Sequence, residues 1–252
     1  LNQPNSLNQL NPPIFAFFPA TPAVYPAKAV VHIQRLQLGH PQFYFYCPKK
    51  RFCMLRSFLQ IVCILFTFQV SLAQVATFNS SGTYTVPSGV YAVSVEMWGA
   101  GGFNPSNNAG AGGGAYVKSR TLLVTPGTNI PVSVGSGGIT NSSFGGMVTA
   151  NGGNGQNGGF QTVSPNVLVS YPGGRGGNGF SGFSSNGGGG GAAGGPLGAG
   201  QNGQNATAST AGTGGNGNLS GGGSGGDGSF GIKKPGDGSA PGGGRGGRGS
   251  AN

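Results

Sequence analysis

Glycine is concentrated in one part of this chain, and this constrains the fold more than any other feature of the sequence. Of the 56 glycines among 252 residues, all but Gly39 lie after Gln74. There they make up roughly three residues in ten, against an ordinary share of about 7%. With so few side chains to bury, such a region must depend heavily on backbone hydrogen bonds. Glycine recurs at every third position in four short series, 152/155/158, 173/176/179/182, 222/225/228/231 and 243/246/249.

A three-residue period matches the polyproline II helix, which has three residues per turn. Glycine at every third position bares one edge of such a helix, so two bared edges can approach and share N–H to C=O hydrogen bonds. The series are too short for a collagen triple helix, which needs unbroken Gly-X-Y repeats. We assign residues 136–252 to this polyproline II or low-complexity region. Composition alone leaves open a disordered Gly/Ser/Asn tract, because glycine-rich chains lose the most backbone entropy on ordering.

The residues that follow Gln74 have the pattern of short β-strands instead. Val93, Val95 and Met97 alternate with polar residues, which is the period of a half-buried strand. Proline- and glycine-containing turns separate the segments. We therefore predict a mainly β fold, with the strands of a small β-sandwich or jelly roll over 74–135. The expected strands are 76–78, 82–86, 90–98, 116–124 and 130–134.

Residues 54–73 have the three-part form of a secretory signal peptide. A short basic region begins at Met54, an apolar run covers 58–70, and a Ser-Leu-Ala sequence provides small residues for cleavage. The apolar run is too short and too interrupted to span about 30 Å of bilayer comfortably. We predict cleavage between Ala73 and Gln74, and no stable membrane span in the mature chain. A signal anchor that is not cleaved is the alternative.

Residues 1–53 precede this signal and show no sustained helical or strand periodicity. If Met54 is the true start, they are an upstream or disordered leader and not part of the mature protein. Sequencing the N-terminus of the secreted product tests this hypothesis. A mature start upstream of Met54 contradicts it.

The mature chain has few groups for catalysis, because all three cysteines and both histidines precede Gln74. It therefore offers no disulfide and neither a Ser-His nor a Cys-His dyad. Its acids are Glu96, Asp227 and Asp237, which are too few and too scattered for a glycosidase pair or a metal cage. We expect no enzymatic activity, no cofactor and no metal.

The positive charge of the chain lies largely in its first part. After Gln74, seven basic residues face three acids, so the net charge is +4 rather than +10. Arg-Gly-Gly sequences at Arg175 and Arg245 resemble those of RNA-binding tracts. The secretory signal and the low net charge argue against a nucleic-acid partner.

Two residues of the expected strand over 90–98 have more than one interpretation. Glu96 is either an acid or ligand with a function, or a solvated or ion-paired strand residue, and we favour the second. Trp98 lies on the same face of the strand as Glu96. We expect it to anchor packing where the strand meets the glycine region rather than to bind a ligand.

Four Asn-x-Ser/Thr sequons follow the predicted cleavage site, at Asn79, Asn141, Asn205 and Asn218. In a secreted eukaryotic protein, each is a site for N-glycosylation. A chain this rich in Asn, Ser and Thr also yields sequons by chance. We therefore expect one or two of them to be used.

Four stretches share a recognisable pattern: TYTVPSGVYAVSVEMWGAGG (83–102), AGAGGGAYVKSRTLLVTPGTNIPVSVGSGG (109–138), SSFGG (142–146) and NGGNGQNGG (151–159). They resemble the secreted glycine-rich domain family. That family includes the glycine-rich domain of anaplastic lymphoma kinase-type receptors and related bacterial and phage tail-fibre domains. The resemblance is specific over roughly 76–195 and implies a β-sandwich with a polyproline II bundle inserted between strands. The family's glycine region usually returns to a closing strand, but no apolar alternation follows 167–169 here. We therefore expect either that the glycine-rich region is incomplete at its C-terminus or that the sheet is closed differently.

The resemblance implies a rigid extracellular binding or adhesive module. We expect a secreted, non-enzymatic structural or adhesive protein that contacts an extracellular protein or polysaccharide surface. Two alternatives stay open. One is an ectodomain fragment of a glycine-rich receptor that binds a protein ligand. The other is an ice- or surface-binding protein, against which the scattered Asn, Arg and Phe side chains argue.

Overall fold

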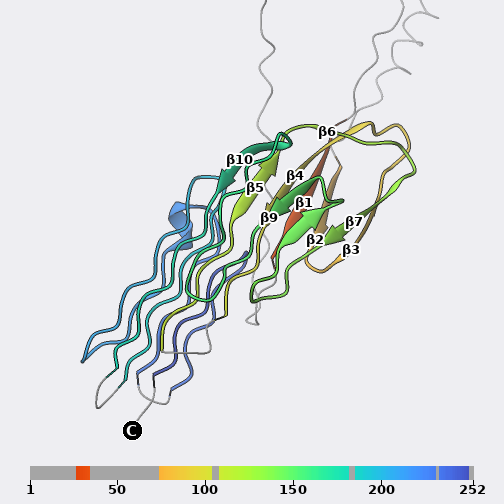
Figure 1. The fold of residues 1–252 in the computed structure, drawn as a ribbon. Coiled ribbons are helices and arrows are strands. Elements are labelled where there is room, and N and C mark those ends of the chain that lie inside the picture. The colour runs from red at the N-terminus through yellow and green to blue at the C-terminus, as the bar shows by residue number, and fades with distance from the viewer. Residues whose placement is uncertain (1–26, 35–73, 104–107, 182–184, 231–232, 250–252) are drawn as a thin grey trace, which may run out of the picture.

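The computed structural model describes residues 27–34, 74–103, 108–181, 185–230 and 233–249. They form two antiparallel β-sheets and a bundle of extended glycine-rich segments that runs away from one end of the sheets (Figure 1). In these ranges, helix is confined to one 3₁₀ turn, η2 (Gly217–Leu219). The predicted mainly β fold is confirmed. The predicted signal peptide lies outside the described residues, and none of the described helical structure is long and apolar enough to cross a membrane.

Two open sheets contain all the named strands. The larger sheet has the order β10-β5-β4-β1-β2, with β6 also paired to β4. Its strands are β1 (Ala29–Gln34), β2 (Val75–Phe78), β4 (Ala92–Trp98), β5 (Tyr116–Ser119), β6 (Leu122–Leu123) and β10 (Val167–Tyr171). The smaller sheet has the order β3-β7-β8-β9. Its strands are β3 (Gly82–Thr85), β7 (Asn129–Ser133), β8 (Ser142–Phe144) and β9 (Val148–Ala150).

A hydrophobic core joins the two sheets as the layers of a sandwich. β4 contributes Val93, Val95 and Met97, whose alternation predicts the strand, and all three are fully buried. From the smaller sheet, the rings of Tyr84 and Phe144 meet with their centroids 5.9 Å apart. The alternating pattern therefore identifies the inner face of β4 correctly.

Residues 1–53 show no sustained strand periodicity in the sequence, yet the structure contains strand β1 (Ala29–Gln34) there. β1 lies inside the larger sheet, between β4 and β2, and is drawn in red-orange in Figure 1. Its inner residues Ala29 and Val31 belong to the core, while Val30 packs on the opposite face of the sheet. Because both faces of this short strand contact apolar groups, its sequence AVVHIQ shows no clean two-residue period.

The single strand expected over 116–124 is interrupted. The register against β4 slips by one residue between β5 and β6, which makes a β-bulge. At this point the Ser119 hydroxyl accepts a hydrogen bond from the backbone N–H of Val95 (2.7 Å). The extra residue places Leu122 in the core and leaves Leu123 exposed.

Three strands lie beyond residue 135, where the sequence predicted the glycine-rich region alone. β8 and β9 form a hairpin whose turn contains Gly145 and Gly146, both with positive φ. β10 pairs antiparallel with β5 at the edge of the larger sheet. These strands are three to five residues long, too short to show a reliable period. Glycine-rich segments are therefore inserted between strands.

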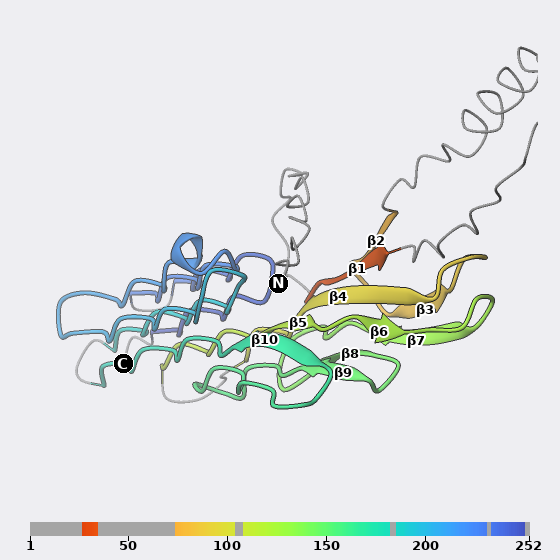
Figure 2. The same cartoon turned by 90° about the horizontal axis from the view of Figure 1, so that it is seen from above.

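The glycine-rich segments run side by side, as two perpendicular views show (Figures 1 and 2). Backbone N–H groups of residues 110–115 donate in turn to three different neighbours. The first and fourth donate to 174–177 (both 2.9 Å), the second and fifth to 242–245 (both 2.7 Å), and the third and sixth to 151–155 (both 2.9 Å). Residues three apart thus face the same neighbour, which is the geometry of a polyproline II helix.

The number of consecutive glycines depends on how many neighbours a segment has. Residues 187–191 are five glycines in a row, and all five are buried. A Cβ on any of them would overlap a backbone carbonyl of another segment. In 201–205, by contrast, Gly203 alone is glycine and the other positions carry exposed Gln and Asn. A fully enclosed segment thus needs glycine at every position, whereas an outer segment needs it only on its inner edge.

The predicted three-residue series can be compared with these contacts. Gly173, Gly176 and Gly179 pack on 108–113. Glycines 222, 225 and 228 face 187–194, and glycines 243 and 246 face 224–227. Gly182 and Gly231, the last members of two of the predicted series, lie outside the described residues. The prediction of one packing edge is wrong for the 152/155/158 series, because Gly155 lies in a turn with φ +55° and has no neighbouring atoms where a Cβ would be. A glycine that allows a turn cannot be told by spacing alone from one that allows packing.

Candidate binding surface

Two outer segments of the bundle present polar side chains in a regular row. Residues 172–179 and 199–206 run parallel, because the N–H groups of Gly203 and Ala206 donate to the carbonyls of Arg175 and Asn178 (both 2.8 Å). The side chains that this pairing brings together we call the amide face. Its members are Gln156, Arg175, Asn178, Asn202 and Asn205.

Side-chain oxygens on the amide face bind the neighbouring backbone. The Oδ1 atoms of Asn202 and Asn205 accept hydrogen bonds from the N–H groups of Arg175 and Asn178 (both 2.7 Å). Gln156 donates from Nε2 to Asn178 Oδ1 (2.6 Å) and accepts from Arg175 Nη2 (3.1 Å). Because the asparagine oxygens are used inward, their Nδ2 groups and the remaining N–H groups of the Arg175 guanidinium can meet acceptors outside the protein.

The spacing of these groups follows from the backbone. Arg175 and Asn178 are three residues apart, as are Asn202 and Asn205, so each pair lies on one side of its segment. At about 3.1 Å per residue, the repeat along the bundle is about 9 Å. The amide face is not among the features that the sequence predicts. The QNGQN sequence over 201–205 does indicate a row of amides on one side of the segment, since its Gln and Asn residues each repeat after three positions.

The predicted strand residues Glu96 and Trp98 both lie on β4. Glu96 is 4% exposed and its Oε1 is 3.0 Å from Lys118 Nζ, so the ion-paired interpretation is confirmed. Trp98 meets Tyr116 with ring centroids 5.0 Å apart, and both pack against Ala193 of the bundle. Trp98 is therefore the packing anchor that the sequence predicts.

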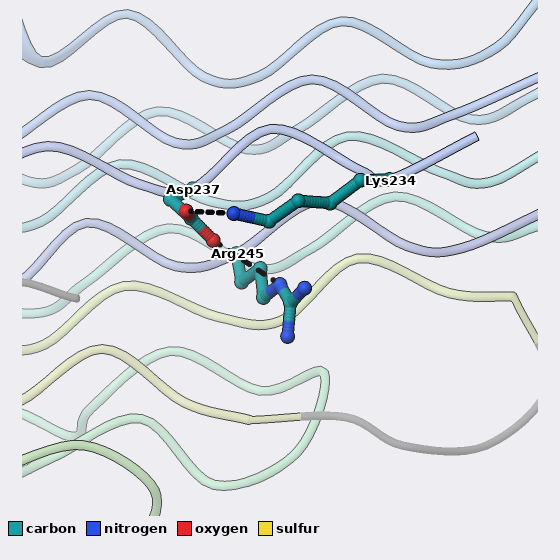
Figure 3. A network of polar contacts seen from close by, with 3 residues as sticks. All are labelled: Lys234, Asp237 and Arg245. Atoms are coloured by element: carbon teal, nitrogen blue, oxygen red, sulfur yellow. Dashed lines mark hydrogen bonds and ion pairs between the residues drawn. The ribbon is translucent and has the colours of Figure 1, made fainter. Parts of the chain in front are cut away.

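Asp227 and Asp237, the two other acids after Gln74, make further polar contacts within the bundle. Asp237 binds Lys234 (3.0 Å) and Arg245 (3.3 Å), as Figure 3 shows. Asp227 accepts a hydrogen bond from the N–H of Gly214 (2.8 Å). Within the described ranges, no three His, Cys, Asp or Glu residues gather into a possible metal site.

The glycine-rich domain family matches residues 76–252. The chain belongs to this family. The match covers nine of the named strands, from β2 to β10, and the whole described bundle, whereas β1 lies outside it. Comparisons with curated proteins and with solved structures give no match.

The four sequons of this glycine-rich domain are all at exposed asparagines: Asn79, Asn141, Asn205 and Asn218. Asn141 Oδ1 accepts from Gly152 N–H (2.9 Å), and Asn205 Oδ1 is bound on the amide face. N-glycosylation uses the nitrogen of the side chain, so these oxygen contacts are compatible with a glycan. Of the predicted cleavage pair, Gln74 is exposed just before β2, and Ala73 lies outside the described residues.

Tyr116 makes the stability of the glycine-rich domain depend on alkaline pH. Burial, followed by the charge and hydrogen bond of Glu96, raises the pKa of Tyr116 far above its usual 10. The folded state therefore keeps the phenol neutral, while the unfolded state loses its proton above about pH 10. Stability is full below pH 10 and should fall by about 1.4 kcal/mol for each further pH unit.

Urea unfolding between pH 8 and pH 11 measures this dependence, with Tyr116→Phe as the comparison. The variant should lose less stability than the parent over the alkaline part of the range. Tyr84, whose pKa burial also raises, is present in both proteins and cancels in the difference. Equal alkaline slopes in the two proteins contradict the assignment to Tyr116.

Proposed function

We propose that this glycine-rich domain is a secreted, non-enzymatic structural and adhesive module whose amide face binds an extracellular polysaccharide or protein surface. The observation that carries the proposal is the row of amide and guanidinium groups on a hydrogen-bonded backbone. The resemblance to secreted glycine-rich domains, including those of anaplastic lymphoma kinase-type receptors, supports an extracellular setting.

Rigidity is the physical advantage of such a face. A flexible surface must order its side chains on binding, at about 0.5–1.5 kcal/mol for each long side chain. Here the inner oxygens of Asn202 and Asn205 are already bound to the backbone of the neighbouring segment. Their remaining N–H groups and Arg175 suit hydroxyl, carbonyl and carboxylate acceptors, which polysaccharides carry in repeating rows. A repeating ligand can therefore gain several weak contacts at once.

Replacing Arg175 by alanine should weaken binding to such a ligand. Loss of one charge-assisted hydrogen bond corresponds to roughly a tenfold decrease in affinity. The assay is retention of the full chain on immobilised cellulose, chitin and an acidic polysaccharide. Arg120→Ala is the matched control, because this exposed arginine lies after β5, outside the amide face. Equal affinities for the two variants, or no binding to any ligand of the panel, count against the proposal.

Secretion has its own test. Expression of the full chain in eukaryotic cells should release a product whose first residue is Gln74 and which carries glycans on one or two sequons. N-terminal sequencing and mass spectrometry before and after enzymatic deglycosylation give both answers. A product retained in the cell, or one that begins upstream of Met54, contradicts the secreted form of the proposal.

A further inference from the structure

β1 lies inside the larger sheet of the domain, although in the sequence it precedes both the family match and the predicted cleavage site. β1 pairs with β4 over six residues and with β2 over four, antiparallel in both cases. In the order of the larger sheet, it is the strand that connects β2 to β4. Yet the family match begins after it, at residue 76, and the predicted cleavage after Ala73 lies between β1 and β2. This second point rests on the proposed secretion.

Removal of β1 would leave a strand-sized site in the larger sheet. One edge of β4 would lose its hydrogen-bonding partner, and β2 would lose the strand that joins it to the sheet. The core would also lose Ala29 and Val31, both 0% exposed. An open strand edge beside an apolar core readily takes up another extended segment.

We propose that the space between β4 and β2 is a strand-acceptor site, which binds an extended segment of a separate polypeptide antiparallel to β4. The side chains of β1 indicate which residues such a segment needs. The residue opposite Met97 must be as small as Ala29, and the residue opposite Val95 must be an aliphatic such as Val31. Main-chain hydrogen bonds supply affinity, and these alternate inward positions supply specificity.

Contacts outside the strand pairs extend the recognition. The N–H of Trp98 donates to the carbonyl of Lys28 (2.8 Å), and the N–H of Ala27 donates to Gly135 (2.9 Å). On the outer face, Val30 lies opposite Glu96 and packs on the Trp98–Tyr116 cluster. The site therefore requires apolar side chains at three successive positions of the partner, which few solvent-exposed segments offer.

Strand exchange in the full chain tests the proposal. A recognition sequence for a specific protease is placed between residues 35 and 73, and the folded protein is cut there. A fluorescent peptide of residues 27–34 in excess should then replace the cut β1, with one peptide per monomer by native mass spectrometry and a rise in anisotropy. The uncut chain should take up far less peptide, because its own β1 stays at high effective concentration.

Two altered peptides define the specificity. The peptide with Val31→Asp should bind roughly a hundredfold more weakly or worse, because it buries an unpaired carboxylate. The peptide with Lys28→Gln should bind like the parent, since Lys28 is partly exposed and contributes its backbone carbonyl.

No uptake after prolonged incubation, uptake that does not distinguish Val31→Asp, or exchange that yields only swapped dimers would overturn the proposal. These outcomes are independent of the amide face, whose test uses the uncut chain. They are also independent of secretion, because the protease cut stands in for the predicted cleavage. Failure of the strand-acceptor site and failure of the proposed function can therefore be told apart.

Discussion

Replacing Gly190 by alanine is expected to lower the free energy of unfolding by about 3 kcal/mol, at the upper end of the usual cost of overpacking. The new Cβ would overlap the carbonyl of Gly244, which is backbone and cannot turn aside as a side chain could. Gly190 also donates to Gly226 and accepts from Gly215 (both 2.8 Å), so any shift disturbs bonds to further segments. Urea unfolding followed by circular dichroism measures the loss.

Gly82→Ala is the matched control, because it is the same substitution at a glycine with room. The nearest atoms to its Cβ are ring carbons of Phe78 at 3.6 Å, an ordinary contact, and its φ is not in the left-handed region. We expect a change within about 0.5 kcal/mol, or slight stabilisation through a less flexible unfolded chain. If Gly190→Ala unfolds like Gly82→Ala, residues 187–191 are not enclosed as described.

The glycine pattern predicts the local conformation of the bundle but not its connectivity. A three-residue period implies one packing edge per segment, and in three of the four series at least two successive described glycines face one neighbouring segment. The spacing does not predict which segments are neighbours, because glycine has no side chain to specify a partner. The parallel pairing of 172–179 with 199–206 depends on the whole arrangement of the bundle. The three-residue spacing therefore predicts each of the two rows of polar side chains on the amide face, but it does not predict that the two rows lie side by side.

The sequence likewise predicts some strands of the sheets and misses others, depending on how each strand is covered. β4 is recognisable because one of its faces is apolar throughout, with Val93, Val95 and Met97 all in the core. β1 is covered on both faces and β10 is interrupted by a register shift between Val167 and Val169. In neither case does hydrophobicity alternate cleanly, so the two-residue period fails for a physical reason.

Replacing Trp98 by alanine should cost about 3–5 kcal/mol, the range for large aromatic side chains removed from a buried site. Trp98 is 7% exposed and lies between Tyr116 of the larger sheet and Ala193 of the bundle. The cavity would open where the two parts of the domain meet, and the rigid glycine backbone on one side cannot collapse to fill it. The loss can be measured by urea unfolding with far-ultraviolet circular dichroism.

Trp98→Phe separates packing from hydrogen bonding at this junction. Among the described residues, the indole Nε1 has no hydrogen-bond partner, so phenylalanine loses volume but no bond. We expect a smaller cost of roughly 1–2 kcal/mol. The chain has a single tryptophan, so in the parent protein its fluorescence reports the junction alone.

The Trp98 side chain is also expected to determine whether the sheets and the glycine-rich bundle unfold together. If Trp98 couples them, its fluorescence and circular dichroism should follow one transition in the parent, and Trp98→Ala should give two resolved transitions by circular dichroism. A single transition in Trp98→Ala, shifted no further than in Trp98→Phe, would mean that sheet and bundle are joined mainly by backbone hydrogen bonds. Those bonds include Ala115 N–H to Asn151 and Gly194 N–H to Gly114 (2.9 and 3.0 Å), which continue the packing of the bundle up to the first residues of β5.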